Sequence, residues 1–356
     1  MLSCVTVPLQ VPLAPLTTLG LGGPARRLVE AATDEQVVEA VAAADRAGER
    51  LLILGGGSNV VISDAGFDGT VVRIQSRGVT ANGGGERVQL HASAGEAWDD
   101  LVARCVAEGL AGIECLSGIP GLAGATPIQN VGAYGQQVAD VIVSVRAYDR
   151  EARSVTEMNH EQCDFAYRTS VFRGSSRYVV LGVTFVLERS PRALPLRYPE
   201  LARALGARLG ARPPLEAVRD AVLALRRRKG MVIDPSDADS RSAGSFFLNP
   251  LLSAADFAAL QRRVAERLGD EVHPPAWPER SGCMKTSAAW LIEHAGFHRG
   301  YGRGRVGISG KHTLALVNRG GATTAELLAL ARELRHGVLE AFGVALHPEP
   351  TLVGVT

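Results

Sequence analysis

The amino-acid sequence predicts an α+β protein built from three compact parts. Three observations support this: a helical pattern followed by a short apolar run near the N-terminus, apolar β-rich runs in the middle, and helical patterns dominating the last third. The order α/β, then β-rich, then α+β is typical of separately packed parts. The 356 residues, 46% of them hydrophobic, suffice for about two to three domains with real cores.

Helical and strand patterns alternate in the N-terminal half. Residues 33–47 predict a helix, because Thr33 and Gln36 form a capping box and a glycine follows as the stop. The apolar run 51–54 predicts a buried strand, and a second helix is expected at 96–108. Further strands are expected at 60–62, 141–148 and 178–188.

Helical patterns dominate beyond a Pro- and Arg-rich connector, PRALPLRYP (191–199), which indicates a domain boundary. The last predicted helix opens on a capping box of Thr323 and Glu326 and stops before Gly343. The predicted elements of this region are helices at 215–229, 253–268, 286–296 and 323–341 and a strand at 313–317. The predicted parts are 1–75, 76–192 and 193–345, with 346–356 returning to the first.

The charge balance and the cysteines exclude several classes of protein. The 38 basic and 37 acidic residues give a net charge of +1, which argues against nucleic-acid and membrane-surface binding. Five cysteines without a CxxC pattern suggest neither a disulfide scaffold nor a zinc finger, and favour a reducing, cytoplasmic location. No secretion signal is expected, and the longest apolar run, 179–187, is far shorter than the ~20 residues that span a bilayer.

The run GGGSN (55–59) follows a predicted strand and is a candidate phosphate-binding loop. It is no dinucleotide fingerprint, because G-x-G-x-x-G opening a helix is absent, and there is no P-loop pattern either. Consecutive backbone N–H groups can converge on an anion such as a pyrophosphate. An ordinary tight turn explains GGGSN about equally well.

A second glycine-rich loop changes this balance. Between Gly109 and Ala139 only Glu114 carries a charge, and GIPGLAGATPIQNVGAYG (118–135) contains five glycines. An exposed loop would normally be charged, so this one is expected to be buried against a large, flat ligand. The two loops, roughly sixty residues apart, suit the two ends of a long ligand with phosphates in its middle.

Six motifs occur in the order in which they occur in one known family, and the resemblance covers nearly the whole chain. They are LTTLGLGG (16–23), LGGGSNVVI (54–62), SGIPGLAGATPIQNVGAYG (117–135), YRTS (167–170), SAGSFFLNP (242–250) and PEPTLVG (348–354). With them the chain resembles the UDP-N-acetylenolpyruvoylglucosamine reductases, flavoenzymes of bacterial peptidoglycan precursor synthesis. The resemblance implies a p-cresol methylhydroxylase-type FAD-binding domain of two α/β subdomains (1–75 and 76–192), followed by an α+β substrate-binding domain (193–345).

The resemblance implies FAD bound non-covalently and NADPH as the reductant. The expected FAD-binding residues lie in the two glycine-rich loops. They are Gly55, Gly56, Gly57, Ser58, Asn59, Ile119, Pro120, Gly121, Gly124, Ala125, Thr126, Gln129, Asn130, Gly132, Ala133 and Tyr134.

In the family reaction NADPH reduces FAD, and the flavin then passes hydride to the vinyl carbon of UDP-N-acetylglucosamine-enolpyruvate. Negative charge develops on the α-carbon and the carboxylate, so a proton donor and a carboxylate ligand are needed. The resemblance assigns the proton to Ser245. A nucleophilic role is not supported, because G-x-S-x-G is absent. Without the resemblance, a serine closing a turn would be the favoured interpretation.

Arg168 in YRTS matches the family's active-site arginine, since a guanidinium can bind a carboxylate through two hydrogen bonds. A surface arginine is the plain alternative; family members often have Asp at the position of Thr169. Glu349 matches the catalytic glutamate, which hydrogen-bonds the substrate carboxylate or its enol form. Pro350 departs from the family pattern, in which an apolar residue such as Val is expected, and the flanking prolines are expected to fix the backbone on both sides of Glu349.

Four further residues are expected to bind substrate. Tyr198 lies in LRYPELARAL (196–205), which looks like the tyrosine loop of the longer family type that closes over substrate. Lys229 matches a lysine that contacts substrate or NADPH phosphates, although cations ending a helix also complement its dipole. Asn249 is expected to contact substrate or nicotinamide, and His312 is expected to contact substrate.

No metal site is expected. His294 and His298 have i, i+4 spacing on a predicted helix, but Glu293 precedes His294, so H-E-x-x-H is absent. Two other functions stay open: another FAD oxidoreductase on the same scaffold, and a non-catalytic nucleotide-sugar binding protein. The partner is expected to be the small-molecule substrate, with the chain a monomer or weak oligomer.

Overall fold

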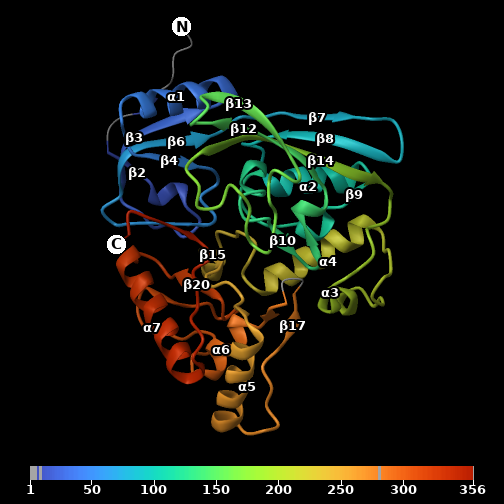
Figure 1. The fold of residues 1–356 in the computed structure, drawn as a ribbon, viewed down its shortest axis with the longest axis vertical. Coiled ribbons are helices and arrows are strands. Elements are labelled where there is room, and N and C mark those ends of the chain that lie inside the picture. The colour runs from blue at the N-terminus through green and yellow to red at the C-terminus, as the bar shows by residue number, and fades with distance from the viewer. Residues whose placement is uncertain (1–5, 8–9, 280–281, 356) are drawn as a thin grey trace. The chain divides into compact units, whose positions relative to one another are not determined.

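The computed structural model describes residues 6–7, 10–279 and 282–355, which fold into two compact units (Figure 1). Unit 1 contains residues 25–57 and 67–228 with the described residues before Pro12. Unit 2 contains residues 12–24, 58–66 and the described residues from Lys229 onward. No helix within these described ranges is long and apolar enough to cross a membrane.

A mainly parallel sheet forms the N-terminal part of unit 1, in the order β1-β3-β6-β4. Its strands are β1 (Thr6–Val7), β3 (Pro24–Ala31), β4 (Leu51–Leu54) and β6 (Phe67–Ile74), and β2 (Val11–Pro12) also pairs with β3. Helix α1 (Asp34–Arg46) packs on this sheet through a buried face that includes Val37 and Val41. The Thr33 hydroxyl accepts from the Gln36 N–H at 3.3 Å, so the predicted helix start is confirmed.

An antiparallel sheet of order β13-β12-β14-β8-β7 forms the second part of unit 1. Its strands are β7 (Val79–Asn82), β8 (Arg87–Ser93), β12 (Ile142–Asp149), β13 (Ser154–Asn159) and β14 (Tyr178–Arg189), with β9 (Leu110–Ala111) paired to β14. Helix α2 (Trp98–Ala107) buries Trp98 against Phe185, with ring centroids 5.9 Å apart. Residues of both sheets share one hydrophobic core, so unit 1 is continuous.

Unit 1 ends with two helices, α3 (Pro199–Ala204) and α4 (Leu215–Arg228). The connector 191–199 lies inside this unit, where Ala193 and Leu196 are buried in the common core. The chain passes from unit 1 to unit 2 after Arg228. The three predicted ranges, 1–75, 76–192 and 193–345, stay a prediction.

Unit 2 combines small sheets with three helices. The sheets are β15-β20-β19, β16-β18-β17 and the parallel pair β5-β21. The strands are β5 (Val60–Ile62), β15 (Ser242–Ser245), β16 (Leu251–Leu252), β17 (Trp277–Pro278), β18 (Met284–Lys285), β19 (Val306–Ile308), β20 (Ala315–Asn318) and β21 (Thr351–Val353). The helices are α5 (Ala254–Leu268), α6 (Ala288–His294) and α7 (Thr324–Phe342).

The longest helix of unit 2, α7, starts and ends where the sequence predicts. Thr323 and Glu326 form the complete capping box, and Gly343 closes the helix with φ of 70°, a left-handed conformation that favours glycine. Helix α7 packs through Leu334 and Phe342 into a core that also contains Phe246 and Phe247. These two phenylalanines follow Ser245 directly and are each 1% exposed, so they anchor its strand.

Candidate active site

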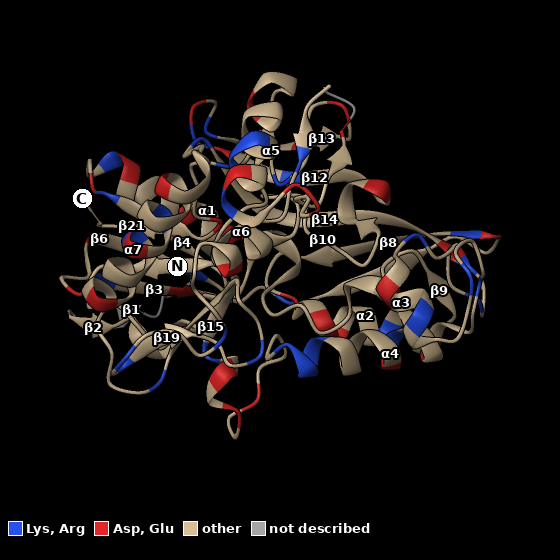
Figure 2. Cartoon of the chain, turned by 90° about the horizontal axis from the view of Figure 1, so that it is seen from below, with Lys and Arg blue, Asp and Glu red and all other residues tan. Residues whose placement is uncertain are grey.

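Gly55 and Gly56 of the first glycine-rich loop lie against the second loop within unit 1. A Cβ atom on Gly56 would lie 3.0 Å from the Cα of Gly121, and one on Gly55 would lie 3.5 Å from the Leu122 side chain. The backbones approach so closely that a side chain on Gly56 would press on main-chain atoms. The ribbon near β10 (Gly132–Ala133) is largely tan in Figure 2, in keeping with the uncharged second loop.

Asp99 of α2 anchors the start of the second loop. Its carboxylate accepts the Gly118 N–H at 2.6 Å and two bonds from the Arg219 guanidinium, at 2.7 and 2.9 Å. Burial raises the pKa of Asp99, but the hydrogen bonds from Arg219 and Gly118 outweigh it, so the pKa lies below its usual value. Asp99 therefore stays ionised and fixes the loop to α2 and α4.

Three hydrogen bonds attach the YRTS turn to the same loop. The Asn130 amide donates to the Ala166 carbonyl at 3.1 Å, and the Ser170 hydroxyl donates to the Ile128 carbonyl at 2.8 Å. Between them, Nη2 of Arg168 donates to the carbonyl of Gly132 at 2.8 Å. The structure thus brings the predicted arginine to the predicted FAD loop.

Left-handed backbone is concentrated at these residues. Six described residues other than glycine have positive φ, and three of them are Asn130 (45°), Tyr134 (48°) and Arg168 (53°). Such a conformation costs roughly 1–3 kcal/mol per residue and is typical of functional sites. The Arg168 side chain is consequently presented from a strained turn, whose ends Ala166 and Thr169 pair with each other.

The other predicted loop residues differ in what they do. Gly124 is buried, and a Cβ there would lie 2.4 Å from the Ala94 Cβ, so this glycine is required for packing. The Thr126 hydroxyl donates to the Ala123 carbonyl at 2.8 Å and is buried. Residues that are at least partly accessible and suit contact with a ligand are Ile119, Pro120, Gly121, Ala125, Gln129, Gly132 and Ala133.

In unit 2, main-chain pairing brings Ser245 and Glu349 onto neighbouring segments. The Glu349 N–H donates to the Phe246 carbonyl at 2.9 Å, and Phe247 pairs with Pro348. Two residues beyond Glu349, the Thr351 N–H donates to the Asn59 carbonyl at 3.0 Å. Glu349 is therefore held on both sides, with Pro350 buried between the two bonds, and both Ser245 and Glu349 are half-buried.

The four predicted substrate-binding residues lie in different settings. Tyr198 is 40% exposed, and its ring meets that of Tyr134 edge-on, with centroids 5.5 Å apart. Lys229 is half-buried just after α4. The Asn249 Oδ1 accepts the Ala288 N–H at 3.0 Å, so this atom caps α6. His312 is half-buried, and its carbonyl accepts the Ala315 N–H at 3.1 Å.

Arg226 is a candidate that the sequence did not separate from its neighbours. It is 8% exposed, whereas Arg227 and Arg228 of the same basic turn are exposed. Burial lowers the pKa of Arg226 to about 10, and the charges of Tyr134, Asp99 and Arg168 act on it. A buried cation beside the second loop suits an anionic ligand. The sequence signal for its burial was its i, i+4 spacing from the apolar Val222, which places both residues on the same face of α4.

Trp277 and Lys285 form a second candidate pair that sequence reasoning missed. Trp277 is 46% exposed and stands directly opposite Lys285, so both side chains lie on one face of the small sheet. Lys285 also pairs with Glu279. An exposed indole beside an ammonium group can stack on a base and meet a phosphate. The tryptophan within PPAWPE was the only sequence signal.

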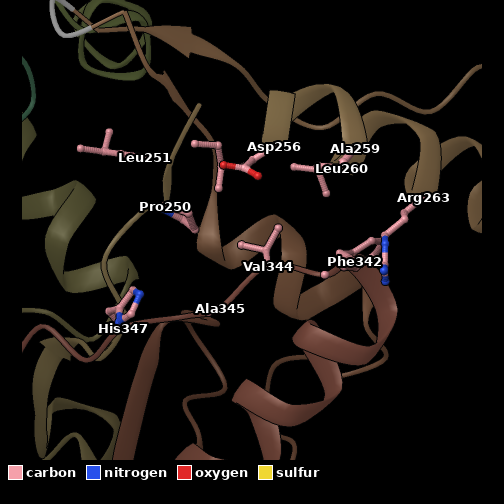
Figure 3. A pocket seen from close by; sticks show the side chains of 12 residues that line it. Pro250, Leu251, Asp256, Ala259, Leu260, Arg263, Phe342, Val344, Ala345 and His347 are labelled. Atoms are coloured by element: carbon pink, nitrogen blue, oxygen red, sulfur yellow. The ribbon is translucent and has the colours of Figure 1, made fainter. Parts of the chain in front are cut away.

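A cavity of about 300 Å³ in unit 2 contains none of the predicted site residues. Figure 3 shows Arg263 beside Phe342 at the end of α7, with Val344 and Leu260 lining the cavity. The Arg263 guanidinium lies next to Gly343, where a cation complements the dipole of the helix.

His294 and His298 were predicted to lie on one helix, and the structure shows that they do not. Helix α6 ends at His294, because Gly296 has φ of 103° and cannot continue it. The ring of His294 instead stacks on that of Trp290, with ring centroids 3.9 Å apart. Within residues 10–279 and 282–355, no group of three or more His, Cys, Asp or Glu residues could hold a metal ion.

Comparisons with known proteins match two ranges of the chain to family models. Residues 25–156 match the family model of an FAD binding domain, and residues 234–353 match that of the UDP-N-acetylenolpyruvoylglucosamine reductase C-terminal domain. The chain is 58% identical to the UDP-N-acetylenolpyruvoylglucosamine reductase of Thermobifida fusca, over 97% of this chain and 98% of that one. The Streptomyces coelicolor reductase is also 58% identical, over 97% and 89% of the two chains.

A solved structure has the same fold. The UDP-N-acetylenolpyruvylglucosamine reductase of Thermus caldophilus superposes with a TM-score of 0.65 at 24% identity, over 99% of each chain. The fold class predicted from the sequence is thereby confirmed. The identity to the Thermobifida protein over nearly both full lengths establishes the family, and the chain belongs to the UDP-N-acetylenolpyruvoylglucosamine reductases.

Proposed function

We propose that the chain reduces the enolpyruvyl ether of UDP-N-acetylglucosamine-enolpyruvate to UDP-N-acetylmuramate, with NADPH as reductant, in peptidoglycan precursor synthesis. The observation that carries this proposal is the 58% identity, over 97% of the chain, to relatives that are named as this reductase. The candidate catalytic residues Arg168, Ser245 and Glu349 are all present.

The residues present fit a non-covalently bound FAD. The backbones at Gly56 and Gly121 approach each other closely, and the second loop, residues 118–135, contains no charged residue. Glycine backbone offers N–H groups to a pyrophosphate, and uncharged surface suits a flat aromatic ring system. When bound, FAD would take up hydride from NADPH and supply it to the substrate. The loop residues 55–57 and 119–134 of unit 1 would hold it.

Arg168 binds the substrate carboxylate in this proposal. One donor of its guanidinium is directed to the Gly132 carbonyl at 2.8 Å, which places the charged group beside the second glycine-rich loop. A planar guanidinium matches the two oxygens of a carboxylate. The hydrogen bond to Gly132 orients the side chain before substrate arrives. Negative charge that develops on the carboxylate during reduction is then stabilised by a fixed cation.

Ser245 supplies the proton and Glu349 a hydrogen bond to the carboxylate end of the substrate. The Ser245 Oγ would donate its proton to the α-carbon, which becomes strongly basic as it gains electron density. A neutral donor adds no charge that would oppose the arriving hydride. The main-chain bond between Glu349 and Phe246 joins the two segments that carry these residues.

The chain is proposed to act in the cytoplasm as a monomer or weak oligomer. Four cysteines in the described part of the chain, Cys105, Cys115, Cys163 and Cys283, are free thiols. Burial raises the pKa of Cys163 to about 11 and that of Cys105 to about 12, so both stay protonated. Free, unreactive thiols suit a reducing compartment.

Flavin absorption and stopped-flow kinetics test the proposal. The purified protein should be yellow, NADPH should bleach the flavin, and UDP-N-acetylglucosamine-enolpyruvate should restore its colour without oxygen. A bleached flavin that only oxygen reoxidises would indicate another FAD oxidoreductase. A protein that binds the nucleotide sugar but never binds flavin, even after reconstitution with FAD, would be a non-catalytic binding protein.

A further inference from the structure

Glu114, the single charged residue between Gly109 and Ala139, is completely buried. It opens the short 3-10 helix η2 (Glu114–Leu116), which precedes the second glycine-rich loop. One carboxylate oxygen, Oε2, accepts the N–H of Gly112 at 2.6 Å. The other, Oε1, accepts the N–H of Leu194, eighty residues along the chain, at 2.9 Å. One oxygen thus accepts a local N–H group, and the other accepts an N–H group from a distant part of the chain.

Leu194 begins the segment 194–198, called here the Tyr198 segment. Two further contacts join this segment to the second loop. A Cβ on Gly135 would lie 2.9 Å from the Cβ of Arg197, so the loop backbone lies directly against it. The rings of Tyr134 and Tyr198 meet edge-on at 5.5 Å. Glu114, Gly135 and Tyr134 therefore support the segment at its start, near its end and at its tip.

The Tyr198 segment is fixed at its base and open at its tip. Leu196 is 3% exposed and pairs through its N–H with the Ala211 carbonyl at 2.9 Å, whereas Tyr198 is 40% exposed. A cavity of about 130 Å³ lies between segment and loop, lined by Cys115, Gln136, Leu194 and Arg197 among others. Leu194 and Leu196 are thus two main-chain anchors that precede the exposed Tyr198.

We propose that Glu114 is a positioning residue that sets the place of Tyr198 relative to the second glycine-rich loop, and thereby the binding of the nucleotide-sugar substrate. This inference rests on the proposed function for the identity of the ligand. A carboxylate is required because two N–H groups from different segments need two acceptor oxygens. A glutamine of the same shape accepts only one of them and turns an amide N–H toward the other.

Trypsin cleavage after Arg197, whose side chain is 66% exposed, tests how firmly the Tyr198 segment is held. This measurement does not require the protein to be catalytically active. Glu114→Gln should raise the initial cleavage rate in the native protein about tenfold, because the segment opens more often. Asp149→Asn is the control for loss of a buried carboxylate elsewhere in unit 1, since Asp149 on β12 accepts two backbone N–H groups and also binds Arg177. It should leave this rate unchanged. Equal cleavage of Glu114→Gln and the parent protein would overturn the proposal.

Gly135→Ala approaches the same segment from the other side. Its Cβ would press on Arg197, and its φ of 85° disfavours any side chain, so the same increase in cleavage is expected. This variant keeps the test decisive if Glu114→Gln does not fold. Cleavage at the parent rate in a folded Gly135→Ala protein would show that loop and segment are not coupled, against the proposal.

A double-mutant cycle distinguishes positioning from a general loss of structure. Glu114→Gln should raise KM for UDP-N-acetylglucosamine-enolpyruvate about tenfold, but less than about twofold when Tyr198 is already alanine. A tenfold increase in both backgrounds would mean that Glu114 does not act through Tyr198, and would overturn the proposal. If no variant or parent protein reduces this substrate, the proposed function fails, while the trypsin comparison still decides the role of Glu114.

Discussion

The N–H of Glu349 donates a 2.9 Å hydrogen bond to the carbonyl of Phe246, the residue that follows Ser245. One main-chain bond therefore joins the two segments that carry the candidate catalytic residues of unit 2. Phe246 and Phe247 are each 1% exposed, so the strand that carries Ser245 cannot shift without disturbing the core. A change in activity on altering either side chain should consequently report chemistry rather than movement of the backbone.

Ser245→Ala should separate the two half-reactions. Reduction of the flavin by NADPH is expected to stay within about twofold of the parent rate, because it requires no proton from Ser245. Reoxidation by substrate should slow by ~10² or more, as for the loss of a general acid. Stopped-flow absorbance of the flavin measures both rates.

Ser253→Ala is a suitable control for this experiment. Its hydroxyl caps α5 in the same unit by accepting the Asp256 N–H at 3.1 Å, so its loss lowers stability without altering either half-reaction. If Ser245→Ala slowed both halves equally, Ser245 would be a structural residue.

Glu349→Gln should produce a smaller defect, also confined to the second half-reaction. The amide keeps an N–H donor and an oxygen acceptor and leaves the main-chain bond to Phe246 intact. A decrease of about tenfold in the rate of reoxidation by substrate is expected. A variant that is reoxidised as fast as the parent would contradict any catalytic role for Glu349.

Arg168→Lys should weaken binding of the enolpyruvyl carboxylate. Lysine keeps the charge but cannot donate to the Gly132 carbonyl and to both carboxylate oxygens through one planar group. The second-order rate of reoxidation by substrate should fall about 30-fold, with flavin reduction by NADPH less affected.

Arg173→Lys is the matched control, because Arg173 donates to the Arg168 carbonyl and lysine can still do so. It should change the same rate by less than about threefold. Equal effects of the two substitutions would indicate that the turn, and not the Arg168 guanidinium, is what matters.

Local signals made the helices predictable, and the site only in part. Thr33 and Thr323 predict the starts of their helices because the residues that cap a helix lie within four positions of each other in the sequence. The positive φ of Arg168 and the burial of Glu114 follow from contacts with Gly132 and Leu194, far along the chain. The predicted boundary at 191–199 lies inside unit 1, because tertiary packing buries Leu196.

Gly56→Ala should cause loss of flavin. The added Cβ would lie 3.0 Å from the Gly121 Cα, and because that neighbour is main chain, the second loop must shift. The ratio of flavin to protein absorbance after purification should fall, and FAD should bind at least about tenfold more weakly on reconstitution.

Gly84→Ala provides the comparison, since a Cβ there meets nothing within 4 Å. It should retain the parent flavin content. Full flavin retention by Gly56→Ala would show that the approach of the two loops is not required for binding the cofactor.

Asp149→Asn should alter how stability depends on acid. Hydrogen bonds from Arg177 lower the pKa of Asp149 to about 2, against ≈ 3.9 in an unfolded chain. The carboxylate therefore stabilises the fold above about pH 4, and this contribution is lost as the pH falls toward about 2. Thermal unfolding should show a lower Tm for the variant at pH 7 and a flatter decline in Tm from pH 4 to 2. Asp68→Asn, at a side chain that is 80% exposed, should follow the parent curve. Parallel curves for Asp149→Asn and the parent protein would rule out this contribution.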